Sequence, residues 1–111
     1  MSGKSPLCGI HAATVAPLKD DFSVDHSVLK KLIADICSIP GINGFLINGH
    51  AGEHAQLSSA EKTQVIKSVC DVVSTGLYIT SGVYSENTLE AMKEAENAER
   101  AGADALLVFP P

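Results

Sequence analysis

The sequence predicts an α/β fold made of parallel strands, the N-terminal half of a (β/α)8 TIM barrel. Three observations lead to this prediction. Short apolar runs start near residues 8, 44, 77 and 105, amphipathic helical patterns separate them, and no hairpin turn signal occurs between them. Strand–helix units that repeat roughly every thirty residues are typical of parallel βαβ connections, in which each strand is buried on both faces.

The first strand is expected within Cys8–Val15, which is rich in small and β-branched residues and is closed by Pro17. A helix should follow, because apolar residues then recur on one helical face. Asp25 is placed to cap its start, and Pro40 with Gly41 should end it. The apolar face comprises Val28, Leu29, Leu32, Ile33, Ile36 and Cys37.

The second strand is expected at Gly44–Ile47, too short for a helix, and it runs into a glycine-spaced loop. The second helix opens with the capping-box pattern Ser58-Ser59-Ala60-Glu61, in which Ser58 and Glu61 bond each other's backbone amides. Gly76 has the residue type expected just after its end. Its apolar face comprises Val65, Ile66, Val69, Cys70 and Val73.

The third strand is expected at Leu77–Ser81, and Ser85 is a good N-cap for a helix over Glu86–Ala101. The glutamates of this helix predict a solvated face. The fourth strand is expected at Ala105–Phe109. The resulting order is β-α-β-α-β-α-β with all strands parallel.

Two architectures accept this order: a doubly wound open sheet and the first half of a barrel. The half barrel explains why the chain stops on a strand, before a covering helix, at about half the ~250 residues of a typical barrel. We therefore predict an N-terminal fragment or truncated product, with a tail at residues 1–7 and a truncated barrel domain at residues 8–111.

Composition narrows the class of protein. Lys and Arg number 8 against 13 Asp and Glu, a net charge of −5, which argues against nucleic acid as a partner. The 3 cysteines form no CxxC pair, which favours reduced, buried thiols in a cytoplasmic protein. No signal peptide and no membrane-spanning run are read from the sequence, so no membrane partner is expected.

The densest cluster of polar residues is the loop Gly49-His50-Ala51-Gly52-Glu53-His54, which follows the second predicted strand. The carboxyl ends of parallel strands are where α/β folds place their sites, and glycines let backbone amides approach a carboxylate. The loop is therefore the candidate binding site; the alternative is a tight turn without a ligand.

His50 to His54 also spell the letters H-x-x-E-H of a zinc-peptidase motif. That motif requires a helix, whereas Gly52 lies inside this segment and no helical periodicity surrounds it. No metal is expected here. His11 and His26 are interpreted as structural or solvated, and Tyr84 is either a site residue or a packing residue.

Four landmarks in order resemble the dihydrodipicolinate synthase / N-acetylneuraminate lyase family over nearly the whole chain from Gly9. They are G-I-H-A-A-T-V-A-P at Gly9–Pro17, V-D at Val24–Asp25, G-F-L-I-N-G-H-A-G-E-H-A-Q-L-S at Gly44–Ser58 and G-A-D-A-L-L-V-F-P-P at Gly102–Pro111. Each alone is weak, but their order and spacing are specific.

The resemblance implies a (β/α)8 barrel, usually a tetramer, with class I aldolase chemistry. In such enzymes a lysine on the sixth strand forms a Schiff base with pyruvate or another 2-oxo acid, and the protonated imine acts as an electron sink. A tyrosine on the fifth strand relays protons. The family uses no metal or organic cofactor, so none is expected here.

Carried over by position, the family's carboxylate-binding loop is Gly49, His50, Ala51, Gly52 and Glu53. Its two hydroxyl positions fall on His50 and Ala51, which is a departure from the family pattern. Ala51 retains only its backbone N–H as a donor. His50 is a candidate proton relay, because imidazole titrates near neutrality.

The imine-forming lysine of the family would lie beyond Pro111, and every lysine of this sequence falls in the terminus, a turn or a helix. The 111-residue chain is thus predicted to be inactive alone, as part of a lyase or aldolase acting on a small 2-oxo acid. The alternative is a non-catalytic half barrel, either a 2-oxo-acid binding module or a degenerate copy, forming homo-oligomers. A doubly wound ligand-binding domain is a third interpretation.

Overall fold

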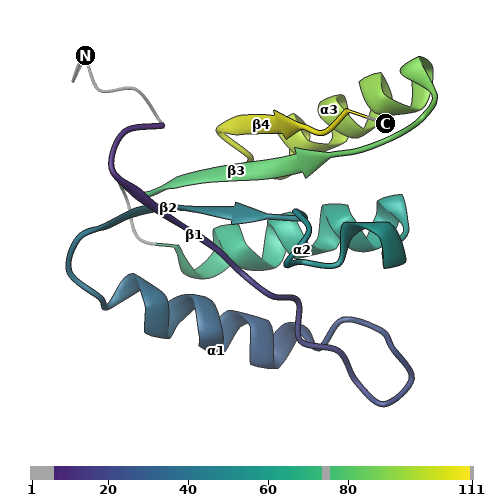
Figure 1. Cartoon of the computed structure of the whole chain (residues 1–111). Coiled ribbons are helices and arrows are strands. Elements are labelled where there is room, and N and C mark those ends of the chain that lie inside the picture. Colours follow the sequence, from purple (N-terminus) through teal and green to yellow (C-terminus); the bar gives the residue numbers. More distant parts are fainter. Residues whose placement is uncertain (1–6, 74–75, 111) are drawn as a thin grey trace.

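The computed structural model describes residues 7–73 and 76–110, and its elements alternate between strand and helix (Figure 1). The predicted tail lies outside the described residues except for Leu7. The elements are β1 (Ile10–Ala13), α1 (His26–Cys37), β2 (Ile42–Ile47), the 3₁₀ turn η1 (His54–Gln56), α2 (Ser59–Val72), β3 (Tyr78–Val83), α3 (Thr88–Ala101) and β4 (Ala105–Val108). The predicted order of strands and helices is confirmed.

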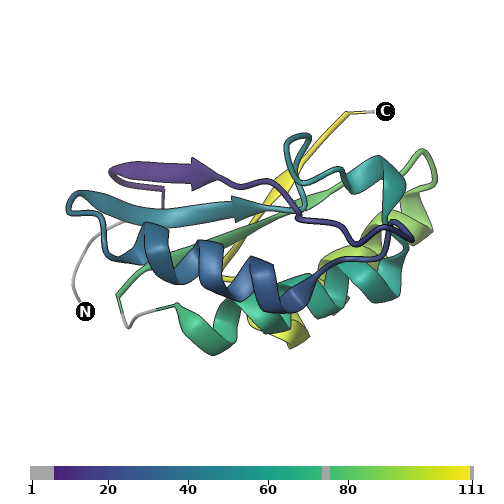
Figure 2. The same ribbon diagram turned by 90° about the horizontal axis from the view of Figure 1, so that it is seen from below.

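The four strands form one sheet in the order β1-β2-β3-β4, and every neighbouring pair is parallel. The three α-helices lie together on one face of this sheet, as the view turned by 90° shows (Figure 2). Consecutive helices pack against each other, α1 on α2 and α2 on α3. All three crossovers therefore pass on the same side, which is barrel-like winding, whereas a doubly wound sheet has helices on both faces.

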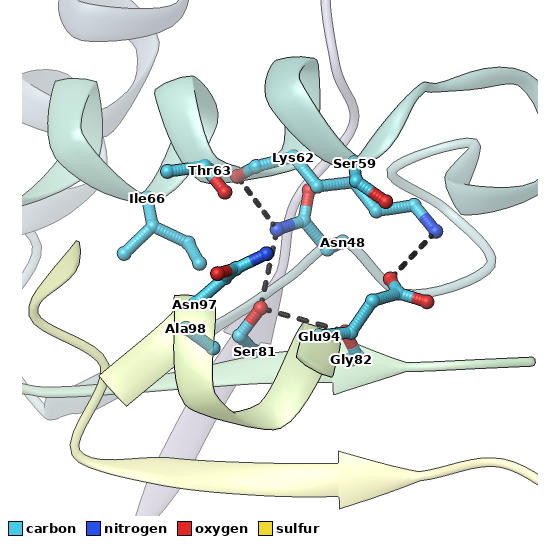
Figure 3. Close-up of a pocket in the computed structure, with 10 residues that line it drawn as sticks. All are labelled: Asn48, Ser59, Lys62, Thr63, Ile66, Ser81, Gly82, Glu94, Asn97 and Ala98. Atoms are coloured by element: carbon cyan, nitrogen blue, oxygen red, sulfur yellow. Dashed lines mark hydrogen bonds and ion pairs between the residues drawn. The ribbon is translucent and has the colours of Figure 1, made fainter. Parts of the chain in front are cut away.

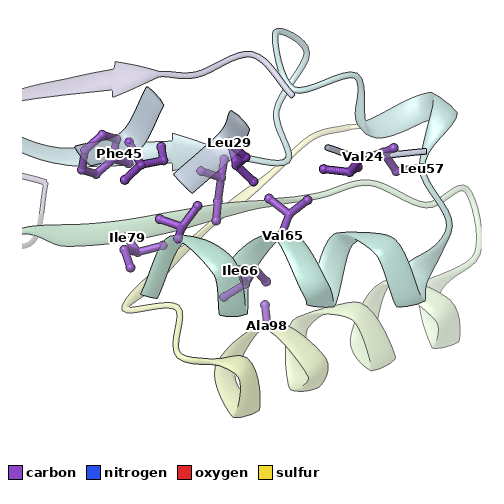
Figure 4. Close-up of a cluster of buried hydrophobic side chains, with 11 residues drawn as sticks. Val24, Leu29, Phe45, Leu57, Val65, Ile66, Ile79 and Ala98 are labelled. Atoms are coloured by element: carbon purple, nitrogen blue, oxygen red, sulfur yellow. The ribbon is translucent and has the colours of Figure 1, made fainter. Parts of the chain in front are cut away.

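The hydrophobic core lies between the sheet and the helices (Figure 4). Phe45, Ile47 and Ile79 point from alternate positions of β2 and β3 toward the helices, as the two-residue period of a strand requires. The helices contribute residues at three- and four-residue spacings. Those with at most 3% exposure are Leu29 and Ile33 of α1, Val65, Ile66 and Val69 of α2, and Ala98 of α3.

The opposite face of the sheet carries a shallow apolar hollow of about 320 Å³. Leu106 and Leu107 of β4 are each 40% exposed there. The lining residues are Leu7, His11, Leu46, Thr80, Leu106 and Leu107. The sheet is open at both sides, because no strand among the described residues pairs with the outer edge of β1 or of β4.

Two predicted caps of helices are confirmed, and two details at helix ends are wrong. The Asp25 carboxylate accepts from Val28 N at 3.1 Å, and Ser58 and Glu61 form the capping box. The third helix, however, begins at Thr88 and is capped by Asn87, because the Asn87 carboxamide accepts from both Leu89 N and Glu90 N. Ser85 instead accepts from Asn87 N. α2 ends at Val72, which leaves Gly76 beyond the position that follows the cap.

Strand boundaries differ from the prediction by one to two residues at most ends. β1 is shorter than expected, whereas β2 begins at Ile42 and β3 continues to Val83. Backbone pairing with a neighbouring strand sets these limits, and hydropathy does not report it. Cys8 is exposed, contrary to expectation, and Cys37 and Cys70 are half-buried free thiols. No helix of the described part is long and apolar enough to cross a membrane.

Candidate functional site

The candidate site lies where β2, β3 and β4 end. The loop after β2 carries His50 and His54, Tyr84 follows β3, and Phe109 follows β4. The parallel register aligns these ends, since Ile47 pairs with Ser81 and Val83 with Val108. Phe109 N also donates to Val83 O at 2.9 Å, which holds the Phe109 backbone beside the end of β3.

The loop after β2 is a compact turn that begins and ends with left-handed residues. Asn48 and Glu53 both have φ near +55°. Glu53 N donates to His50 O at 3.1 Å, and His54 N donates to Gly49 O at 3.2 Å. No hydrogen bond between described residues uses the backbone N–H of Ala51 or Gly52. Both amides therefore have unused donor capacity, and Ala51 is exposed to solvent whereas Gly52 is buried.

Two glycines let backbone segments approach each other at this turn. A Cβ on Gly52 would lie 3.2 Å from Asn48 N, which is tighter than ordinary contact, and would also meet Thr14 O at 3.4 Å. A Cβ on Gly82, in β3, would overlap the Asn48 carbonyl oxygen. Small residues at both positions thus determine how closely the loop sits against the sheet.

Four rings gather above the strand ends. His54 lies against Phe109 with ring centroids 5.2 Å apart and planes within 9°, and against Tyr84 at 5.2 Å. His50 contacts Phe109 at 4.4 Å between centroids. His54 Nε2 and His50 Nδ1 are 2.9 Å apart, which is hydrogen-bond distance. The two imidazoles are therefore hydrogen-bonded to each other, and the Phe109 and Tyr84 rings lie against them.

His54 is only 6% exposed, while His50 is exposed to solvent. Burial lowers the pKa of His54 below its ordinary value of 6.5, because the charged ring would lose its hydration. The neighbouring His50 and the Lys62 ammonium lower that pKa further, and the Glu94 carboxylate raises it. The His54 ring is therefore neutral at pH 7. Its Nδ1 has no hydrogen-bond partner among the described residues.

A polar network supports the loop from the helix side (Figure 3). The Asn48 carboxamide Nδ2 donates to Ser81 Oγ and to Lys62 O, each at 3.1 Å, so it ties the start of the loop to β3 and α2. Lys62 Nζ and Glu94 Oε1 are 3.1 Å apart, and each side chain is 13% exposed. This pair joins α2 to α3. Glu94 is thus an exception to the solvated glutamate face expected for the third helix.

The structure places the predicted site residues as follows. Gly49 and Gly52 are buried in the turn, and His50, Ala51 and Glu53 are exposed around it. Tyr84 joins the ring cluster, whereas the other two histidines lie elsewhere. His26 Nδ1 bonds Ser68 Oγ at 2.8 Å, and His11 Nε2 bonds Cys8 O at 3.1 Å. Of the two roles expected for them, structural or solvated, these hydrogen bonds favour the structural one.

The sequence pattern gave no site role to Asn48, Lys62 or Phe109, and it placed His54 at the end of the polar loop without a role of its own. Only His54 had a signal, its four-residue spacing from His50, and that spacing was considered only for zinc. His54 in fact lies in a one-turn 3₁₀ segment, with its ring against His50. Among the described residues no group of three or more His, Cys, Asp or Glu side chains is arranged to hold a metal ion.

The chain is similar in sequence to a family of known proteins. The model of the dihydrodipicolinate synthetase family matches residues 6–111. The 4-hydroxy-tetrahydrodipicolinate synthase of Bdellovibrio bacteriovorus is 34% identical over 106 residues, which cover 93% of this chain and 34% of the relative. The Methanococcus vannielii protein of the same name is 37% identical over 103 residues, covering 93% and 35%.

Solved structures agree with the fold. A dihydrodipicolinate synthase family protein of Coccidioides immitis superposes with a TM-score of 0.91 at 26% identity, covering 100% of this chain and 37% of that one. Dihydrodipicolinate synthase of Bacillus anthracis gives 0.84 at 26% identity, covering 93% and 35%. The chain spans about a third of the length of these relatives and has the fold of the N-terminal part of their TIM barrel.

Proposed function

Because the chain belongs to the dihydrodipicolinate synthetase family, we propose that it is the N-terminal part of a class I lyase or aldolase. The substrate would be pyruvate or another 2-oxo acid, bound as a Schiff base. The observation that carries the proposal is the turn Gly49–Glu53, which lies at the carboxyl end of β2 with unused backbone amides. Barrel enzymes build their active sites at that end of the strands.

In this proposal the turn binds the carboxylate of the 2-oxo acid. The N–H groups of Ala51 and Gly52 donate to its oxygens, and Gly52 permits the close approach of loop and sheet described above. His50 occupies one hydroxyl position of the family and serves as a donor to the carboxylate and as a proton relay. Ala51 contributes no side-chain donor.

The chemistry needs a lysine that the described residues do not supply. Lys62, Lys67 and Lys93 lie on α2 and α3, Lys30 and Lys31 lie on α1, and Lys19 lies in a turn; Lys4 falls outside the described residues. Lys62 is the lysine near the ring cluster, and its ammonium is paired with Glu94. The 111-residue chain is therefore proposed to be inactive by itself, with the nucleophile supplied by further sequence.

Borohydride trapping tests the reaction. Pyruvate and borohydride should add no mass to the 111-residue protein, and should add one reduced pyruvate to a version extended by any coding sequence that follows Pro111. An adduct on the short chain would contradict our interpretation of its lysines. Failure of an extended chain to form one would favour the non-catalytic half barrel, which the absence of a strand lysine among the described residues supports.

Carboxylate binding is tested separately by titrating the ¹⁵N-labelled chain with pyruvate. The amide signals of Gly49 to Glu53 should shift, and methyl pyruvate, which lacks the negative charge, should leave them unchanged. Equal shifts with the two compounds, or shifts spread over the whole molecule, would contradict a carboxylate site at this turn.

The same proposal extends to the assembly, the cellular location and the cofactors of the active protein. The open edges β1 and β4 and the apolar hollow support assembly with further sequence or, for the isolated chain, a homo-oligomer. The cysteine pattern and the described free thiols support a cytoplasmic location. No metal or organic cofactor is proposed for the reaction.

A further inference from the structure

The bonded pair of imidazoles at the site has a buried member for which the proposed function gives no role. We propose that His54 is a positioning residue that holds His50 in its Nε2–H tautomer, so that the loop presents an N–H donor to a carboxylate. This inference rests on the proposed function for the identity of the ligand only. The arrangement of the two rings is a property of the free protein.

The His54 ring cannot readily turn. It is 6% exposed and is packed between Phe109, nearly parallel at 5.2 Å, and Tyr84, tilted by 50° at 5.2 Å. Its one hydrogen bond among the described residues is the 2.9 Å contact to His50 Nδ1. A close-packed ring with one bonded nitrogen has a defined orientation.

The neutral His54 ring carries its proton on Nε2. A neutral imidazole has one N–H and one bare nitrogen. His54 Nδ1 is buried without a partner among the described residues. Placing the hydrogen on Nδ1 would bury an unsatisfied N–H, whereas placing it on Nε2 uses it in the bond to His50. Orphaned buried donors are rarer than under-used acceptors, so His54 donates from Nε2.

The same hydrogen bond determines the tautomer of His50. Its Nδ1 accepts the His54 proton, so the neutral His50 ring must carry its own hydrogen on Nε2. His50 is exposed, which leaves this second nitrogen accessible to a ligand. The His50 Nε2–H then donates a hydrogen bond to a carboxylate oxygen without proton transfer, as a hydroxyl at that position would.

Four titratable or charged groups face His54. His50 lies on the same loop, the Lys62 ammonium lies on α2, the Glu94 carboxylate on α3, and the Tyr84 phenol follows β3. Each neutral ring carries one proton. A further proton on His50 Nδ1 would turn the His54–His50 hydrogen bond into a contact between two donors and release His50 from its orientation, whereas a further proton on the buried His54 Nδ1 would leave the bond in place.

The test is NMR of the full 111-residue chain labelled with ¹⁵N in histidine. Both rings should show the Nε2–H pattern at pH 8, with a scalar coupling between His54 Nε2 and His50 Nδ1 across the hydrogen bond. His26, bonded to Ser68, serves as an internal reference. A His50 ring in the Nδ1–H form, or a mixture of forms, would overturn the proposal without any variant.

Two variants separate positioning from packing. His54→Phe retains an aromatic ring but removes the donor, so His50 should become a mixture of tautomers and pyruvate should bind about tenfold more weakly, the effect of one lost hydrogen bond. His54→Gln supplies a side-chain N–H and should restore the single tautomer and most of the affinity. An unchanged His50 tautomer in His54→Phe would overturn the proposal. If the wild type shows the predicted tautomers but binds no pyruvate, only the proposed function fails.

Discussion

Lys62 and Glu94 form an ion pair of 3.1 Å between α2 and α3, and their charges act on the buried His54 with opposite signs. The ammonium lowers the pKa of His54, and the carboxylate raises it. The pair therefore joins two helices and also contributes to the electrostatic environment of His54. Disturbing either partner should have both a structural and an electrostatic effect.

The first prediction concerns this pair. Glu94→Gln leaves the mostly buried Lys62 ammonium without a counter-charge and should lower the free energy of unfolding by about 3 kcal/mol. Glu96→Gln, on the same helix, breaks an exposed pair with Arg100 and should change it by less than about 0.5 kcal/mol. Urea unfolding of both variants checks this, and equal losses would contradict a special role for the buried pair.

The second prediction concerns acid stability. The pKa of folded His54 lies below 6.5, so as the pH falls through 6.5 the unfolded chain takes up a proton first. Stability should decrease from pH 7.5 downward, until the pH passes below the folded pKa. Comparing urea midpoints of wild type and His54→Gln at pH 7.5 and 5.5 measures the effect. The variant should lose less stability over this range, and an equal loss would exclude His54 as the cause.

The third prediction concerns the contact between loop and sheet. Gly82→Ala places a methyl group on the Asn48 carbonyl oxygen and should destabilise the protein by about 2–3 kcal/mol, because two backbone segments must separate. Gly49→Ala is the matched control for stability. Its Cβ would meet the end of the Leu46 side chain at 3.4 Å, an ordinary contact, and should change stability by less than about 1 kcal/mol. A Gly82→Ala protein as stable as this control would show that the contact is not tight.

The fourth prediction separates the side-chain hydrogen bonds of Asn48 from its left-handed backbone conformation. Asn48→Gly removes the hydrogen bonds to Ser81 and Lys62 but keeps a residue that tolerates φ of +55°, and should cost about 2 kcal/mol of stability. Asn48→Ala adds backbone strain and should cost about 1 kcal/mol more. Thermal unfolding distinguishes the two variants. Equal stabilities would mean that the backbone conformation contributes nothing.

Much of the fold could be predicted because its signals are local. The capping residues Asp25 and Ser58 act within a few residues, and both are confirmed. The apolar face expected for α1 is confirmed by the buried Leu29 and Ile33, whereas Val28 is 48% exposed. The start of α3 was misplaced because Ser85 and Asn87 are both good caps by composition. Only the backbone conformation selects Asn87, which has extended φ and ψ while its side chain reaches two amides.

The sequence by itself determined the order of the elements, the parallel sheet and the position of the glycine-spaced turn after β2. These depend on periodicity, capping and the length of crossover connections, all of which are short-range properties. The tertiary structure alone decided that His54 bonds His50, that Phe109 covers both rings, and that Glu94 leaves the solvated face of α3 to pair with Lys62. The His54–His50 bond lies within one loop and depends on its backbone conformation. The other contacts join residues on different elements, and strand register and helix packing bring them together.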